Sequence, residues 1–113
     1  MWLFTEFGFF SVVQKAGQNC LTVRSRIRAD LEQLKGKCLP SIGEIVEGIG
    51  TDYPYRAKVT HEAFAEALKA VALGIHYSNF KNHIAQTQGP QRAHAYSRVW
   101  GDLLDLQDEE DMA

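Results

Sequence analysis

The first fifteen residues are dense in aromatic and β-branched side chains, a composition that favours a β-strand. Gly8 lies within this run and is expected to break it or to form a bulge. After a short polar turn at residues 16–19, apolar and polar side chains alternate along residues 20–27, a period of two that is typical of a half-buried strand. We therefore predict that residues 9–15 and 20–27 pair as a hairpin.

The period changes at Ile27, where apolar side chains begin to recur at helical spacing. Ile27, Leu31, Leu34 and Cys38 form one apolar stripe, which predicts an amphipathic helix that ends by Pro40 and faces the sheet. Acidic side chains in its first turns and basic side chains in its last turn suit the helix dipole.

Two more strands and a second long helix follow. Residues 42–48 and 55–59 are predicted strands, joined by a loop with two glycines and Pro54, which is typical turn chemistry. Thr60 is the predicted N-cap of a helix that ends near Leu73. The apolar stripe of this helix consists of Phe64, Leu68, Val71 and Ile75.

The C-terminal third reads as two helices and a tail. Ser78 or Asn79 is expected to cap a short helix that runs through Ile84, and a polar link leads to a last helix over about residues 92–106. The acidic residues 107–113 are predicted to be a disordered tail, because they contain too little apolar surface to order themselves.

The predicted order is β-β-α-β-β-α, followed by short helices. Because each pair of strands precedes a helix, the expected architecture is α+β: a two-layer sandwich in which helices cover one face of a mostly antiparallel sheet of four to five strands. A ferredoxin-like arrangement belongs to this class. A single domain over residues 1–106 is predicted, because 113 residues with 45% hydrophobic side chains can bury a core without metals or disulfides.

Charge and cysteine content limit the function further. The formal net charge is −2, but five of the acidic side chains lie within the last nine residues, so residues 1–104 carry a net charge of +3. This excess is smaller than that of a dedicated nucleic-acid-binding domain. Cys20 and Cys38 lack the spacing of a metal site and are predicted to be free thiols.

The N-terminus is apolar but lacks the basic region and the cleavage site of a signal peptide. No apolar run approaches the roughly 18 residues that a membrane helix requires. We therefore expect a cytoplasmic protein in a reducing compartment, with no membrane partner.

Recognised catalytic and metal-binding motifs are lacking. The histidines lie on three segments without the i, i+4 spacing of two ligands on one helix face; they are His61, His76, His83 and His94. The serines have no nucleophile-elbow pattern, and the glycine run at residues 48–50 precedes a strand instead of the helix that a phosphate loop needs. No catalytic residue, metal or cofactor is predicted.

Two groups of residues remain as candidates for ligand binding. The loop before the last strand carries more aromatic and charged chemistry than a turn needs, in Asp52, Tyr53, Tyr55 and Arg56. Alternating positions of two predicted strands carry the cations Arg24, Arg26, Arg56 and Lys58. The aromatic residues expected near these cations are Trp2, Phe4, Phe10 and Tyr55.

Cations interleaved with aromatic rings on an open sheet suit single-stranded nucleic acid or a small anionic ligand. The simpler interpretation is a solvated outer face, in which arginine stems cover the rings and pair with Glu44 or Glu47. A third interpretation is a homodimer contact through the aromatic face. We interpret the protein as a binding or interaction module; the alternative is a small enzyme acting on an anionic substrate held by residues 52–56.

Three segments also carry a resemblance. MWLFTEFGFFSVV at residues 1–13, TDYPYRAKV at 51–59 and YSNFKNHIA at 77–85 resemble a family of small bacterial proteins without an assigned function. The likeness covers most of residues 1–106, and the acidic end lies outside it. It implies no catalytic or binding residues.

Overall fold

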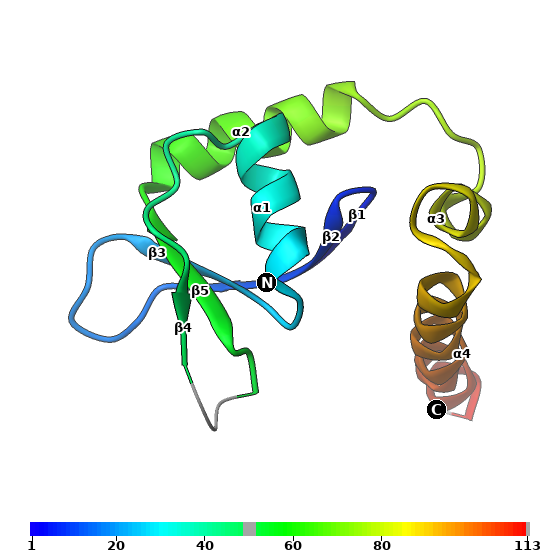
Figure 1. Ribbon diagram of the computed structural model, residues 1–113. Coiled ribbons are helices and arrows are strands. Elements are labelled where there is room, and N and C mark those ends of the chain that lie inside the picture. The colour runs from blue at the N-terminus through cyan, green and yellow to red at the C-terminus, as the bar shows by residue number, and fades with distance from the viewer. Residues whose placement is uncertain (49–51, 113) are drawn as a thin grey trace. The chain divides into compact units, whose positions relative to one another are not determined.

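The computed structural model describes residues 1–48 and 52–112, the last four of them by their backbone alone. The chain divides into two compact units, Met1–Ile75 and His76–Ala113. The first unit holds β1 (Trp2–Thr5), β2 (Gly8–Val13), β3 (Leu21–Ser25), α1 (Arg28–Lys37), β4 (Val46–Glu47), β5 (Tyr55–Val59) and α2 (His61–Leu73), and the second holds α3 (Phe80–Gln88) and α4 (Pro90–Met112) (Figure 1).

The five strands form one antiparallel sheet in the order β1-β2-β3-β5-β4. The predicted α+β class and the two-layer sandwich are thereby confirmed, and the strand order, which the sequence left open, is now defined. A ferredoxin-like domain has the element order β-α-β-β-α-β. The first unit has β-β-β-α-β-β-α instead.

Both helices of the first unit bury their apolar sides with one face of the sheet. α1 contacts β2, β3 and β5, and α2 contributes Phe64 and Ala67 to the same buried cluster. Leu31 and Leu34 are fully buried as predicted, but Ile27 is exposed, because it precedes the first turn of α1 as its N-cap. The remaining cluster members are Phe10, Val12, Val23, Leu39, Ile42, Ala57 and Val59.

The N-terminal aromatic run forms two strands, so Gly8 breaks it, which is one of the two outcomes expected from the sequence. The Thr5 hydroxyl accepts hydrogen bonds from the backbone N–H groups of Phe7 and Gly8 and donates one to the Gly8 carbonyl, which closes a tight turn. Gly8 adopts a φ of +149°, a conformation that only glycine takes up readily. Gly8 therefore begins a new strand that folds back on the first.

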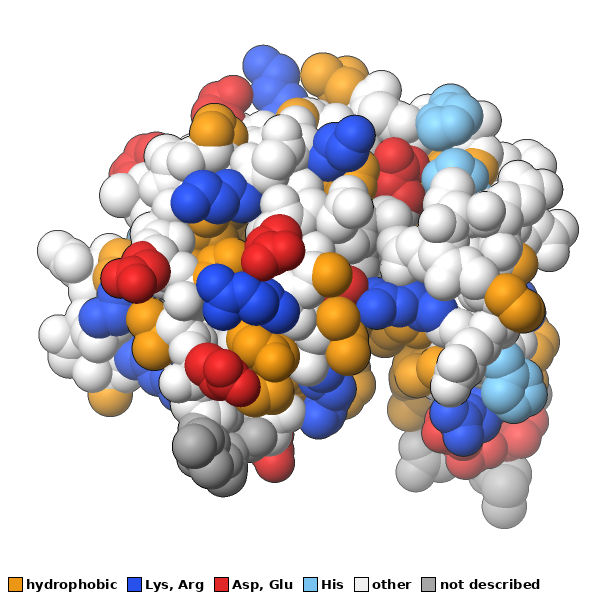
Figure 2. Space-filling model, viewed as in Figure 1, with side chains coloured by type: hydrophobic (Ala, Val, Ile, Leu, Met, Phe, Trp, Pro, Cys, Tyr) orange, Lys and Arg blue, Asp and Glu red, His pale blue; other side chains and the backbone are white. Residues whose placement is uncertain are grey.

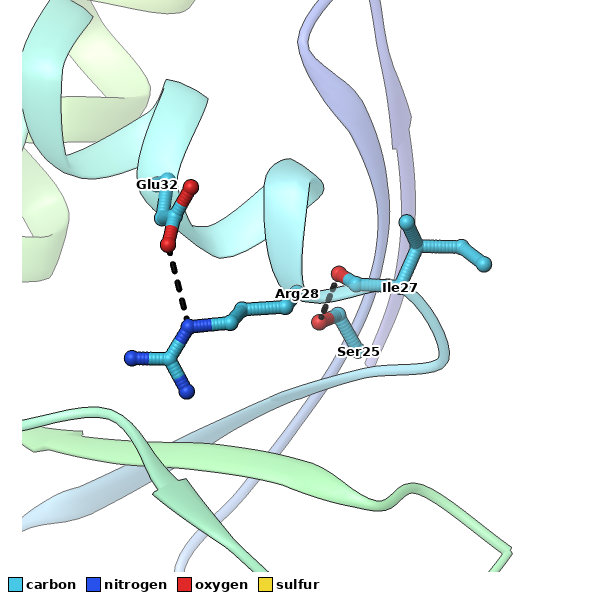
Figure 3. A network of polar contacts seen from close by, with 4 residues as sticks. All are labelled: Ser25, Ile27, Arg28 and Glu32. Carbon is cyan, nitrogen blue, oxygen red and sulfur yellow. Dashed lines mark hydrogen bonds and ion pairs between the residues drawn. The ribbon is translucent and has the colours of Figure 1, made fainter.

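α1 begins without a side-chain cap. Just before it, the Ser25 hydroxyl donates to the Ile27 carbonyl at 2.7 Å, and on its exposed side Arg28 pairs with Glu32 at 3.0 Å (Figure 3). Asp30 is only 5% exposed, and its carboxylate accepts a hydrogen bond from the Phe9 N–H. The acidic residue that suggested a helix-dipole role thus also ties α1 to β2.

The strand predicted over residues 42–48 is only two residues long. Ile42 belongs to the core, and the Gly43 N–H donates to the Lys58 carbonyl at 2.8 Å, so this segment still lies against β5. The Gly48 N–H donates to the Pro54 carbonyl at 2.7 Å at the base of the connecting loop. Residues 49–51, part of the predicted turn, lie outside the described residues.

The second unit is a pair of helices. The Asn79 side chain caps α3 by accepting from the Asn82 N–H, as predicted, and Ile84 is fully buried. The polar link predicted at residues 86–91 reduces to Gly89, because α3 continues to Gln88 and α4 begins at Pro90, a favoured first helical residue. Within residues 1–48 and 52–112, no helix is both long and apolar enough to cross a membrane.

α4 continues to Met112, beyond the predicted end at residue 106 and through the residues predicted to be a disordered tail. Gln107 and Asp108 are exposed. Because exposed polar residues at a terminus contribute little burial, we expect deletion of residues 107–113 to change the free energy of unfolding by less than about 0.5 kcal/mol. Urea denaturation of the parent and the shortened chain measures this difference; a larger loss would show that the tail docks on the folded protein.

Candidate functional site

One face of the sheet carries the core, and the other, which we call the helix-free face, carries most of the candidate residues. Its central row runs across all five strands, because the partners in each strand pair point to the same side. The row consists of Trp2, Ser11, Arg24, Arg56 and Val46. Phe4 and Phe9 form the next pair along β1 and β2, and Thr22 and Lys58 form the next pair along β3 and β5.

Four rings form an aromatic cluster on this face: Trp2, Phe4, Phe9 and Tyr53. Phe4 stacks on Phe9 with 4.6 Å between ring centroids, and Trp2 meets Phe9 edge-on at 6.0 Å. Tyr53 lies 6.4 Å from Phe9. Trp2 remains 68% exposed, so one large ring of the cluster is open to a ligand.

Tyr53 is the point at which the two groups of predicted residues meet. It is 7% exposed, and the guanidinium carbons of Arg24 and Arg26 each lie 4.7 Å from its ring centroid. The loop backbone adds two hydrogen bonds, because the Asp52 carbonyl accepts from Arg26 at 2.8 Å and the Tyr53 carbonyl accepts from Arg56 at 3.3 Å. The structure thereby brings together five of the seven predicted binding residues.

The other two predicted residues lie elsewhere. Lys58 is on the helix-free face but further along β5, opposite Thr22. Tyr55 pairs with the fully buried Ser25 and packs against the core, on the face opposite the arginines. Phe10 is also a core residue, so Phe9 and Tyr53 occupy the places expected for Phe10 and Tyr55.

The arginines were predicted to form ion pairs with Glu44 or Glu47. They form hydrogen bonds to a hydroxyl and to backbone carbonyls instead. Arg24 donates to the Ser11 hydroxyl at 2.6 Å, and its Nε is buried without a hydrogen-bond partner among the described residues. In the described part of the chain, none of the four candidate cations forms an ion pair. No carboxylate of a described residue therefore neutralises their positive charge within 4 Å.

A cavity of about 630 Å³ opens at the β4 end of this face. Its charged and polar lining consists of Lys15, Gln18, Thr22, Glu44, Arg56 and Lys58. Arg56 belongs both to the central row and to the cavity, so the two features are continuous. The cavity could not be predicted from the sequence, because Lys15 and Gln18 reach it from the connection between β2 and β3.

The elements for enzymatic chemistry at residues 52–56 are few. Asp52 is exposed and contributes its backbone carbonyl to the loop. Burial raises the pKa of the Cys38 thiol above its ordinary value, which favours the protonated thiol over the nucleophilic thiolate. These observations favour a structural role for both residues.

The second unit brings together two of the four histidines, His76 and His83. His76 and His83 lie 5.3 Å apart by ring centroid, and Tyr77 stacks on His83 at 4.6 Å. Among the residues that the structure describes, no three histidine, cysteine or acidic side chains are grouped so that they could hold a metal ion. The histidine pair therefore reads as part of the aromatic packing of this unit.

The surface charge is mixed. On the face of the molecule drawn in Figure 2, basic and acidic side chains are interspersed with hydrophobic ones and form no large field of one sign. The drawn face thus offers an anion local charged groups and not a strongly basic surface.

The resemblance of three segments to small bacterial proteins was noted from the sequence alone. In comparisons with protein-family models, curated proteins and solved structures, nothing matched the chain.

Proposed function

We propose that this protein is a cytoplasmic binding module that takes single-stranded nucleic acid on the helix-free face of its sheet. The observation that carries the proposal is the aromatic cluster, in which Trp2 is 68% exposed beside Phe4 and Phe9. A base that stacks on an aromatic side chain contributes about 1–3 kcal/mol to binding. Such stacking needs an open ring on a rigid support, and a strand within an antiparallel sheet is such a support.

The cations beside the cluster supply the second requirement. Arg24 and Arg56 lie directly opposite each other on β3 and β5, in the same row as Trp2. A guanidinium offers five N–H donors, of which the observed contacts with Ser11 and the Tyr53 carbonyl use few. Donors therefore remain for the phosphate groups of a strand whose bases stack on the cluster.

Two further observations bear on the class of protein. The contacts of the loop at residues 52–56 are structural, which favours a binding module over the alternative of an enzyme with an anionic substrate in this loop. Cys20 and Cys38 are both free thiols, which suits a reducing compartment such as the cytoplasm.

The test is fluorescence anisotropy with labelled single-stranded RNA and DNA of about eight nucleotides, a length within the range of known sheet-face sites. We expect Trp2→Ala to weaken binding about tenfold or more, because it removes the stacking ring. The matched control is Trp100→Ala, which removes the other tryptophan, 57% exposed on α4, and should leave binding unchanged.

Salt dependence tests the role of the arginines. If two to three phosphates are neutralised, affinity should fall about tenfold between 50 and 200 mM salt. An Arg24→Ala, Arg56→Ala double variant should flatten this slope, whereas Arg28→Ala with Lys35→Ala, two exposed cations of α1, should not. The absence of binding at low salt, or equal binding by Trp2→Ala, would refute the proposal. A parent that is dimeric and becomes monomeric on Trp2→Ala would assign the face to self-association instead.

A further inference from the structure

The cavity next to the helix-free face is large enough for a small molecule. Its volume of about 630 Å³ lies within the range of about 300–1,000 Å³ that is usual for ligand sites. Two strands and one connection supply its walls: β5 with Arg56 and Lys58, β3 with Thr22, and the connection between β2 and β3 with Lys15. The Gly43 backbone completes it, lying so close to β5 that a Cβ at this position would come within 3.2 Å of the Lys58 carbonyl oxygen.

Thr22 is the observation that points to a ligand. Its side chain is on the helix-free face of β3 and only 4% exposed, yet its hydroxyl has no hydrogen-bond partner among the described residues. Buried hydroxyl groups in native proteins are almost always hydrogen-bonded. Because Thr22 lines the cavity, an occupant of the cavity would supply the missing partner.

The charges of the lining define the chemistry of that occupant. Lys15, Arg56 and Lys58 bring three positive charges, and Glu44 is the one acidic residue of the described lining. None of the three cations forms an ion pair in the part of the chain that the structure describes. A phosphate monoester carries a charge between about −1.5 and −2 near pH 7 and offers three strong acceptor oxygens, which matches three cations and a hydroxyl donor.

We infer that this cavity binds a phosphate monoester of nucleotide size, with Thr22 and Lys15 as ligand-contacting residues. The carboxylate of Glu44 is an acceptor of the kind that binds sugar hydroxyls, and Val46 adds an apolar wall. The phosphate has two sources, a free mononucleotide or the terminal phosphate of a strand. Binding of a strand's terminal phosphate in the cavity rests on the proposed function, because the rest of that strand would lie on the helix-free face, to which Arg56 connects the cavity.

The experiment compares four probes by isothermal titration or by competition: adenosine monophosphate, adenosine, and one short oligonucleotide with either a 5′-phosphate or a 5′-hydroxyl group. We expect the parent to prefer the phosphorylated member of at least one pair by about tenfold, the effect of a hydrogen bond to a charged group. Preference within the adenosine pair alone identifies a free nucleotide, and preference within the oligonucleotide pair identifies a strand end.

Two variants test the assignment. Thr22→Val keeps the shape of the side chain and removes a hydroxyl that has no hydrogen-bond partner among the described residues, so it should fold as stably as the parent and lose the preference for phosphate. Lys15→Gln should lose it as well, whereas Lys35→Gln, an exposed lysine of α1, should retain it. The affinity for the 5′-hydroxyl oligonucleotide should be the same in all four proteins, because its contacts lie at the aromatic cluster and the central row, and not at Thr22 or Lys15.

The inference and the proposed function fail in different ways. Equal affinity for the phosphorylated and unphosphorylated members of both pairs, with strands still bound, would overturn the cavity assignment alone. Binding of adenosine monophosphate that depends on Thr22, without binding of either strand, would overturn the proposed function and retain the cavity site. A preference for phosphate that persists in Thr22→Val and in Lys15→Gln would also overturn the assignment.

Discussion

Leu31→Asp should unfold the first unit or lower its free energy of unfolding by about 4 kcal/mol or more. Leu31 has no exposed surface and packs from α1 into the main buried cluster. An aspartate at this position would lose the apolar contacts of the leucine and would bury a carboxylate without a partner. Since domains of this size are stable by about 5–15 kcal/mol, a loss of this magnitude removes much of the total.

Urea denaturation followed by circular dichroism measures this loss. Gln33→Asp is the matched control, because residue 33 is exposed on the same helix and the substitution has a similar effect on helix propensity. A Leu31→Asp protein that unfolds at the same urea concentration as Gln33→Asp would show that α1 does not pack on the sheet, and the two-layer architecture would be wrong.

Local pattern was sufficient for most of the fold. β5 has the predicted bounds, and α2 begins after Thr60, whose hydroxyl accepts from the Ala63 N–H as an N-cap does. These elements combine a clear period with an explicit start signal. The N-terminal run was harder, because it is aromatic on both faces and its turn depends on the buried hydroxyl of Thr5.

The candidate site also contains residues that the local pattern predicted and residues that it did not. Alternation along two strands correctly placed Arg24 and Arg56 on one face, and the register then puts them directly opposite each other. The aromatic partners were misassigned because Phe9 and Phe10 are adjacent and chemically alike, so their composition does not reveal which of them faces the core. Tyr53 reaches the helix-free face from outside any strand, a position that alternation does not predict.

The pairing of Arg24 with Arg56 gives a physical reason for the position of Tyr53 on the helix-free face. Like charges directly opposite each other in a sheet destabilise it. The Tyr53 ring attracts the Arg24 guanidinium at 4.7 Å, and the Tyr53 carbonyl accepts a hydrogen bond from Arg56. One residue thereby offsets the repulsion between two cations and keeps both of them in place.

Gly8→Ala should be the most damaging conservative change in the N-terminal hairpin. Gly8 has a φ of +149°, and a Cβ added there would lie within 2.6 Å of the Cβ and Oδ2 atoms of Asp30. Asp30 is buried and holds the Phe9 N–H, so it cannot move aside without losing that contact. Backbone strain of about 1–3 kcal/mol and overpacking of about 1–3 kcal/mol predict a combined loss of about 2–6 kcal/mol.

The control for this prediction is Gly17→Ala. Gly17 also has a positive φ, +77°, but no heavy atom lies within 4 Å of the position of its added Cβ. The control therefore carries the backbone strain without the overpacking and should cost about 1–2 kcal/mol. Urea denaturation of both variants separates the two contributions. Equal losses would show that Asp30 does not press against β2, and that the link between α1 and the N-terminal hairpin adds nothing to stability.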